Sequence, residues 1–257
     1  MTILRREEIG DLLENKHNQY NHQDFILADP LQVPHSFSVK EDIEIAAFLT
    51  ATIAWGNRVS IIKSANRMMD LLHRSPYDFI RLTGSDDIEG IGRFVHRTYN
   101  TTDFVYFILA LKRLYSDYGG LETVFTEGYK SGSIFNAIVR FRRIFVSAGF
   151  PGHAAKHVSD VEKGSAAKRL NLFLMWMVRK DVRGVHFGLW NGISPADLMI
   201  PLDTHVGRTA RSLGLLTRKT NDWRSVEELT AELRKFDPED PCRFDFSLFG
   251  LGIFDHF

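Results

Sequence analysis

Residues 200–216 read IPLDTHVGRTARSLGLL, in which an apolar run ends at Asp203 and a helix-like pattern follows. Apolar residues recur at three- and four-residue spacing over Thr204–Leu213, which predicts a helix there. Asp203 is then the N-cap, whose carboxylate can accept the backbone N–H of the second or third helical residue. Such a carboxylate can be a structural cap, or it can stabilise a cation or activate a water in a reaction. The residue pattern leaves both readings open.

Helical periodicity extends over most of the chain. Apolar residues recur at helical spacing, and strand-like alternation bounded by Asn-Gly or Asp-Gly turns does not occur. Breakers such as Ser75-Pro76 and Gly119-Gly120 separate the helical segments. The sequence therefore predicts an all-α fold. Further helices are expected within 43–54 and 62–72 and over Phe104–Tyr118, Ser133–Ala148, Ala166–Val182 and Ser225–Lys235.

The composition is that of an ordinary soluble protein. The chain has 257 residues, 44% hydrophobic and 25% charged, which is long enough for one large domain or two small ones. Its one cysteine, Cys242, excludes an internal disulfide framework and any zinc or iron–sulfur site built on several cysteines. The stretch MTILRREEIGDLLENKHNQYN is too polar for a signal peptide, and no apolar stretch is long enough for a membrane span. These features indicate a cytoplasmic protein.

Charge is balanced overall but uneven along the chain. Lys+Arg and Asp+Glu each number 32, so the net charge does not indicate a nucleic-acid partner. Residues 151–220, however, contain eleven basic and five acidic residues. Such an excess can form a basic face that meets a polyanion, or a solvated face that acids elsewhere in the fold balance.

Four segments resemble, in the same order, landmarks of the helix–hairpin–helix DNA glycosylases. The run PLDTHVGRTARSLGLL (201–216) resembles the segment that carries their essential aspartate. The run EIAAFLTATIAWGNRVSIIKSANRMMDLL (44–72) resembles a helix pair whose connecting loop inserts into DNA. The run KGSAAKRLNLFLMWMVR (163–179) resembles the hairpin and the lysine-bearing helix. The run DPCRFDFSLFGLGI (240–253) resembles the late helix before the iron–sulfur cysteines of many members, but those cysteines do not follow it here.

This resemblance implies an all-α, two-lobed fold with a cleft between the lobes and no iron–sulfur cluster. One central helical lobe would comprise residues 40–165, with a degenerate hairpin at its end, and the other would combine 1–39 with 166–257. The resemblance also implies DNA as the partner, with structured RNA as a further candidate. No cofactor, metal or membrane is expected.

Within this resemblance, Lys168 is the expected nucleophile and Asp203 its charged partner. In such an enzyme an amine attacks the sugar C1′ of a flipped nucleotide and forms a Schiff base, with a carboxylate nearby. The implied function is a DNA-repair-like base-excision glycosylase or abasic-site lyase. The residues expected to contact nucleic acid are Trp55, Asn57 and Arg58 on the inserted loop, Gly164 and Ser165 in the hairpin, and Arg169, His205 and Arg208 on the two helices.

Three departures from the glycosylase pattern leave alternatives open. Lys168 and Asp203 are 35 positions apart, so the intervening segment must bring them together. Ala166 replaces the second glycine of the hairpin, where small residues let a phosphate approach the backbone. Trp55 replaces a polar residue, and its ring can wedge beside a flipped base or simply close a helix against the core.

A closer resemblance, over nearly the whole chain, is to an uncharacterised bacterial family of unknown function. It rests on the runs GSAAKRLNLFLMWMVR (164–179), PLDTHV (201–206) and DPCRFDF (240–246). That family looks like a divergent branch of the glycosylase superfamily, but it names no activity. One alternative is therefore a non-catalytic nucleic-acid-binding module on a glycosylase-like scaffold. Another is a helical protein in which Lys168 and Asp203 form a structural ion pair.

His153 and His157 are separated by one helical turn, so they can place two imidazoles on one helix face. The sequence around them shows no HExxH pattern and no paired carboxylate. A metal site at these histidines is therefore not expected.

Overall fold

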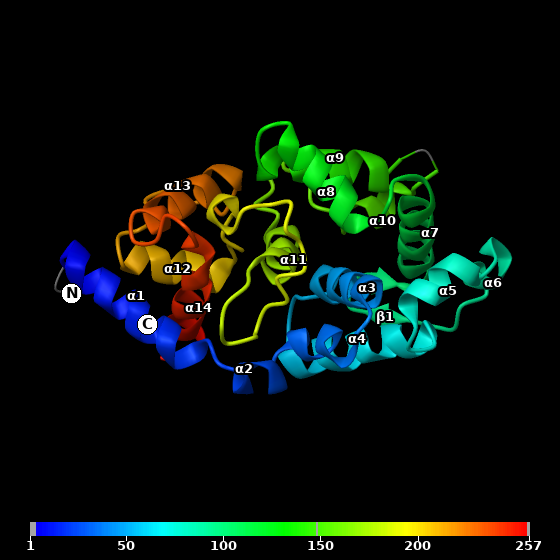
Figure 1. Ribbon diagram of the computed structural model, residues 1–257, viewed down its shortest axis with the longest axis horizontal. Coiled ribbons are helices and arrows are strands. Elements are labelled where there is room, and N and C mark those ends of the chain that lie inside the picture. Colours follow the sequence, from blue (N-terminus) through cyan, green and yellow to red (C-terminus); the bar gives the residue numbers. More distant parts are fainter. Residues whose placement is uncertain (1–3, 148, 256–257) are drawn as a thin grey trace. The chain divides into compact units, whose positions relative to one another are not determined.

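The computed structural model describes residues 4–147 and 149–255 and is predominantly helical (Figure 1). The prediction of an all-α protein is confirmed at that level. The chain divides into two compact units, one formed by residues 26–159 and the other by residues 1–25 together with 160–257. The sequence predicts boundaries between residues 39 and 40 and between residues 165 and 166. In the structure, the chain passes from one unit to the other between residues 25 and 26 and between residues 159 and 160. Gly164 and Ser165 consequently belong to the same unit as Lys168.

The continuous unit, residues 26–159, is built around an aromatic core. The ring of Phe48 lies 6.0 Å from that of Phe107 and 5.4 Å from that of Phe141, and all three side chains are buried. Such ring pairs add stabilisation beyond the apolar area that they bury. The elements of this unit, with α2 at its boundary, are α2 (Asp24–Leu27), η1 (Pro30–Gln32), η2 (Pro34–Ser36), α3 (Lys40–Thr52), α4 (Arg58–Leu71), α5 (Pro76–Leu82), α6 (Ser85–Glu89), β1 (Val95–His96), β2 (Tyr99–Asn100), α7 (Thr101–Asp117), α8 (Leu121–Lys130), α9 (Ile134–Phe145) and α10 (Gly152–Ala155).

A short hairpin precedes α7. Strands β1 and β2 pair antiparallel, and Arg97 in the turn between them has φ 54°. The side chain of Asn100 then accepts the N–H groups of Thr102 and Asp103, while Asp103 accepts the N–H of Asn100. This reciprocal capping box fixes the start of α7. The sequence did not predict the strands, because two residues each are too few to show an alternation.

The discontinuous unit brings both ends of the described chain together. Helix α14 packs against α1 and against α12, and its glycines permit the close approach. A Cβ at Gly250 would lie 2.1 Å from the ring of Tyr20, and one at Gly252 would lie 2.8 Å from Oγ1 of Thr209. The elements of this unit are α1 (Arg6–Tyr20), α11 (Lys168–Val178), η3 (Pro195–Asp197), α12 (Thr204–Ser212), α13 (Trp223–Arg234), η4 (Pro241–Phe244) and α14 (Asp245–Ile253).

The start of α12 at Thr204 is confirmed, but the expected limits of the helix over Ala166–Val182 are wrong at both ends. Helix α11 starts only at Lys168, because Ala167 has the left-handed backbone conformation, with φ 48°. It ends at Val178, after which the backbone of Arg179 is extended. Ala148, the expected end of another helix, lies outside the described residues.

The helices of residues 4–147 and 149–255 include no candidate for a membrane span. None of these helices combines the length and the apolar character that a bilayer crossing requires.

Candidate active site

Lys168 and Asp203 lie close together in the discontinuous unit. The Nζ of Lys168 is 3.9 Å from Oδ2 of Asp203, and the two side chains are 29% and 25% exposed. Lys168 is the first residue of α11, and Asp203 immediately precedes α12. Two helix N-termini therefore present an amine and a carboxylate side by side, and both groups remain accessible to a reagent.

The two oxygens of Asp203 have different partners. Its Oδ1 accepts the backbone N–H groups of His205, at 2.9 Å, and Val206, at 3.0 Å. The predicted N-cap is thereby confirmed. Its Oδ2 faces Lys168 instead. The side-chain amide of Asn221 also donates to the backbone carbonyl of Asp203, at 3.1 Å, which further fixes this residue.

A tight turn leads into Lys168. The N–H of Gly164 donates to the carbonyl of Val161, and the N–H of Ser165 donates to that of Asp160. Gly164 has φ +85°, which favours glycine, and nothing lies within 4 Å of the position that a Cβ would occupy. The hydroxyl of Ser165 accepts the N–H of Ala167 at 3.2 Å. The turn is therefore shaped by the backbone and open on its outer side, while a phosphate contact there stays a prediction.

Asn171 lies one turn into α11, and its side chain fixes the backbone just before that helix. Its side-chain amide donates to the carbonyl of Ala166 at 3.1 Å, and the residue is buried. Residues 173–178 of the helix are buried as well, so α11 is enclosed along most of its length. Lys168 thus projects from the end of a rigid, enclosed element.

The segment between Lys168 and Asp203 is hydrogen-bonded to the C-terminal turn of α11. The N–H of Phe187 donates to the carbonyl of Trp176, and the N–H of Trp190 donates to that of Met177. The segment ends at Asp203, whose carboxylate lies 3.9 Å from the amine of Lys168.

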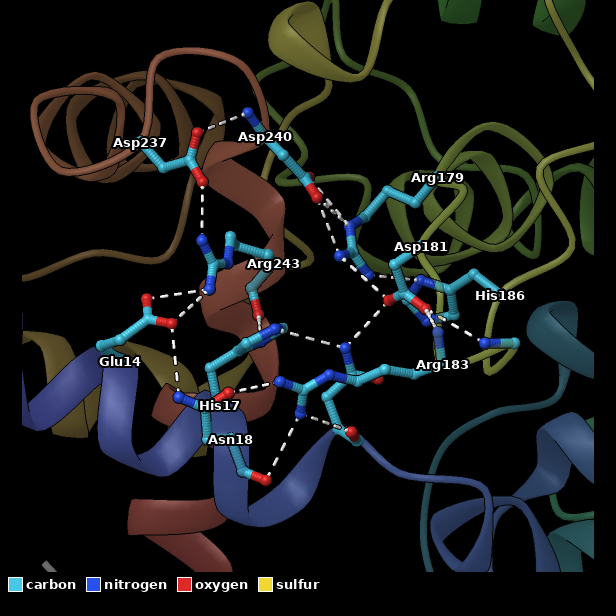
Figure 2. Close-up of polar contacts among 12 residues, drawn as sticks. Glu14, His17, Asn18, Arg179, Asp181, Arg183, His186, Asp237, Asp240 and Arg243 are labelled. Carbon is cyan, nitrogen blue, oxygen red and sulfur yellow. Dashed lines mark hydrogen bonds and ion pairs between the residues drawn. The ribbon is translucent and has the colours of Figure 1, made fainter.

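Arg179 anchors the beginning of that segment (Figure 2). Its guanidinium is 1% exposed and donates to both carboxylate oxygens of Asp240, from Nε at 2.8 and 2.9 Å and from Nη2 at 2.8 Å. Its Nη1 lies 2.7 Å from Nδ1 of His186. A buried arginine needs such partners, because an unpaired charge would be strongly destabilising. Its burial lowers the pKa of Arg179, but the hydrogen bond and charge of Asp240 outweigh this effect and raise it.

Asp181 and Arg243 extend this network to α1. Asn21 donates to Asp181 at 2.9 Å, and Arg243 donates to both oxygens of Glu14, at 2.7 and 2.8 Å (Figure 2). Burial raises the pKa of Asp181, but hydrogen bonds from Asn21 and from the N–H of Arg183 outweigh it and lower the pKa overall. The sequence did not predict this network. Its only signal was the density of charges in RKDVR (179–183) and DPEDP (237–241).

The other candidate residues on α11 and α12 differ in how exposed they are. Arg169 is half-buried on α11, and His205 and Arg208 are exposed on α12. Nη2 of Arg208 lies 3.5 Å from the carbonyl of Gly252 on α14. Their roles toward a nucleic acid stay predictions.

Trp55, Asn57 and Arg58 belong to the continuous unit. The half-buried ring of Trp55 stacks on His157, with centroids 5.9 Å apart and planes at 17°. The side-chain oxygen of Asn57 caps α4 by accepting the N–H of Ser60 at 3.2 Å. Nε of Arg58 is 4.0 Å from Oδ2 of Asp29. The packing of Trp55 favours the reading in which its ring closes a helix end.

The two histidines share a carboxylate partner from outside their own stretch of the sequence. Asp103 lies 2.9 Å from Nδ1 of His153 and 3.4 Å from Nε2 of His157. It comes from a distant position in the sequence, so no local motif could reveal it. Within residues 4–147 and 149–255, no group of three histidine, cysteine or acidic side chains is arranged to hold a metal ion.

Fold and site together define a helical protein with an accessible lysine–aspartate pair at two helix starts. Residues 29–254 match the model of the family described as Protein of unknown function (DUF2400), and the chain belongs to that family. The expected membership in a family of unknown function is thus confirmed, while the relationship to helix–hairpin–helix glycosylases stays a prediction. No curated protein matches the chain, and no solved structure matches it.

Proposed function

We propose that the protein is a DNA-repair-like base-excision glycosylase or abasic-site lyase of the helix–hairpin–helix type. The observation that carries this proposal is the 3.9 Å approach of Lys168 Nζ to Asp203 Oδ2, achieved across 35 positions of chain. Amine and carboxylate are the two groups that a Schiff-base mechanism at a sugar carbon requires.

The chemistry assigned to the pair is as follows. The neutral amine of Lys168 attacks C1′ of the flipped nucleotide, a carbon–nitrogen bond forms, the bond from C1′ to the base breaks, and the departing base takes the proton that the attacking nitrogen loses. Opening of the sugar ring, in which the ring oxygen takes a second proton from that nitrogen, then gives the imine. At an abasic site the same amine adds to the open aldehyde, and loss of water gives the imine. Asp203 stabilises the positive charge that develops at the sugar through its Oδ2, since Oδ1 is already engaged by α12.

Helix stability does not explain a lysine at the start of α11. A cation at a helix N-terminus opposes the macrodipole, at a cost of about 0.3–1 kcal/mol. An acidic residue would stabilise the same position. The partner Asp203 offsets that cost, and it does so with an oxygen that the α12 cap leaves available. This arrangement supports a chemical role for Lys168.

The test is borohydride trapping on duplexes that carry an abasic site or a damaged base. Wild type is expected to form a covalent adduct, and Lys168→Ala is expected to form none. Lys163→Ala is the matched control, because Lys163 is an exposed lysine of the adjacent turn and its loss should leave the adduct yield unchanged. Asp203→Asn keeps an oxygen for the α12 cap but loses the charge, so adduct formation should slow by about 100-fold.

A wild type that traps no substrate, or a Lys168→Ala variant that traps as well as wild type, would contradict the Schiff-base role.

The second candidate is a non-catalytic nucleic-acid-binding module. It is favoured by the open outer side of the Gly164 turn, where backbone can meet a phosphate. This candidate predicts salt-sensitive binding of nucleic acid that survives loss of both Lys168 and Asp203.

A further inference from the structure

Asp103 is a carboxylate almost completely removed from solvent, in the continuous unit. Its side chain is 1% exposed and accepts the N–H of Asn100 at 3.0 Å as part of the α7 cap. It also lies 2.9 Å from His153 Nδ1 and 3.4 Å from His157 Nε2. A capping box alone needs no burial and no histidines, so the cap does not account for this arrangement.

His153 is oriented by that carboxylate. Its side chain is 52% exposed, and Asp103 is its only hydrogen-bond or ion-pair partner among the described residues. A carboxylate at Nδ1 places the ring proton there, which leaves the lone pair on Nε2. The ring therefore presents a proton acceptor of fixed tautomer, in the way that an aspartate holds the base of a catalytic triad.

A second histidine–aspartate pair in the chain shows the contrast. Nδ1 of His22 is 3.7 Å from Oδ2 of Asp24, with side chains 48% and 85% exposed. That aspartate is solvated, and 3.7 Å is too long for a hydrogen bond that would fix the tautomer. The histidines are comparably exposed in the two pairs, whereas the distance of 2.9 Å and the burial of Asp103 distinguish the His153 pair.

A series of contacts leads from the pair to an exposed arginine. Asp103 contacts His157, and the ring of His157 stacks on the half-buried Trp55. The exposed side chain of Arg97 lies over the next residue, with Nη1 2.5 Å from where a Cβ of Gly56 would be. Guanidinium groups pair with phosphates, so Arg97 is the candidate contact to a nucleic-acid backbone.

We propose that Asp103 and His153 form a second catalytic site, at which Nε2 of His153 removes the proton of a 2′-hydroxyl in single-stranded RNA. The 2′-oxygen then attacks the adjacent phosphorus, the bond from phosphorus to the 5′-oxygen breaks, and the 5′-oxygen takes the proton that the imidazole carried. The products are a 2′,3′-cyclic phosphate and a 5′-hydroxyl, so no co-reactant is needed. His153 is the catalytic residue, and Asp103 is a positioning residue.

In this proposal the attacking hydroxyl belongs to the RNA, because the residues bonded to His153 supply none. No serine, threonine or cysteine side chain is hydrogen-bonded to His153 within the described ranges. RNA carries a hydroxyl next to each phosphorus, and DNA does not. The proposal does not depend on Lys168, which belongs to the other unit.

The experiment uses the full chain and an end-labelled, mixed-sequence single-stranded RNA. Wild type is expected to cut it and leave 2′,3′-cyclic phosphate ends, and His153→Gln is expected to cut about 100-fold more slowly or less. His22→Gln is the matched control and should cut at the wild-type rate. Asp103→Asn can still accept the N–H of Asn100 but cannot fix the tautomer, so it should cut slowly and with an altered pH–rate profile.

Three results would overturn the proposal: intact RNA after incubation with folded wild type, an undiminished rate in His153→Gln, or equal cutting when the reacting nucleotide is 2′-deoxy. Lys168→Ala separates this activity from the proposed glycosylase or lyase function. It should abolish borohydride trapping and leave RNA cleavage unchanged, so either activity can fail without the other.

Discussion

His17 illustrates how a single buried residue couples this fold to pH (Figure 2). Its Nδ1 is 3.0 Å from the carbonyl of Arg243, and its Nε2 is 3.3 Å from the side-chain amide of Asn21. Both contacts are satisfied by a neutral ring that carries its proton on Nδ1. Burial, together with the positive charge of Arg243, lowers the pKa of His17 to about 4.

Because the folded pKa of His17 lies below the unfolded value, acid should destabilise the protein through this residue. The unfolded chain binds the proton more readily between about pH 6.5 and pH 4, so the stability contribution is present above that window and lost within it. The expected loss is about 3 kcal/mol. Denaturant unfolding of wild type and His17→Gln across this range measures it, since the substitution removes the titration.

The exposed His22 supplies the control, and His22→Gln should keep the wild-type dependence on pH. Wild-type and His17→Gln stabilities that fall in parallel from pH 6.5 to 4 would contradict the assignment.

Residues whose partners are near in sequence were predictable, and residues whose partners are remote were not. Asp203 caps N–H groups two and three positions ahead, so its role followed from helix spacing alone. Asp103 meets His153, 50 positions away, and Arg179 meets Asp240, 61 positions away. Nothing in a local pattern specifies such a pair, because tertiary packing alone brings the two side chains together.

At the scale of elements, α5 ends on a cation supplied by another helix. Lys112 of α7 donates to the carbonyls of Ile80, Arg81 and Thr83, at 2.9, 3.2 and 2.9 Å. These carbonyls lie at the C-terminal end of α5, where a positive charge interacts favourably with the negative end of the helix dipole. One side chain thus satisfies several acceptors that the helix itself leaves unpaired.

Lys112→Met should therefore lower the free energy of unfolding by about 2 kcal/mol, because hydrogen bonds to a charged group are lost while the aliphatic stem is kept. Denaturant melts provide the measurement. Lys63→Met, at an exposed position of α4, is the control and should change stability by less than about 0.5 kcal/mol. Equal effects of the two substitutions would show that the Lys112 contacts contribute nothing.

The distinction between partners near in sequence and remote partners also explains which helix ends were predictable. Thr204 was correct as the first residue of α12, since the N-cap is encoded by the adjacent Asp203. The expected continuation of α11 to Val182 was wrong, since the backbone of Arg179 is extended and its side chain bonds Asp240, 61 positions away. A helix stopped by a remote ion pair leaves no stop signal in the sequence.

At the scale of the whole molecule, the two units differ in how the chain builds them. Residues 26–159 are continuous and contain their own aromatic core, in which Phe141 stacks on Phe125 at 4.4 Å. The other unit needs residues from both ends of the chain. There α1 contributes buried Ile9 and Leu13, and Tyr20 of α1 fits against Gly250 of α14.

This difference predicts the folding of fragments. Residues 26–159 expressed alone should melt cooperatively with a helical circular-dichroism spectrum, because the ring contacts that form their aromatic core join residues within this range. Residues 160–257 alone should not, since without α1 they lose its apolar side chains and leave Arg243 without Glu14. Addition of an α1 peptide, residues 4–25, should restore a cooperative transition to 160–257, and the same peptide with Leu13→Asp should not. Cooperative melting of 160–257 without the peptide, or none for 26–159, would refute this assignment of the two cores.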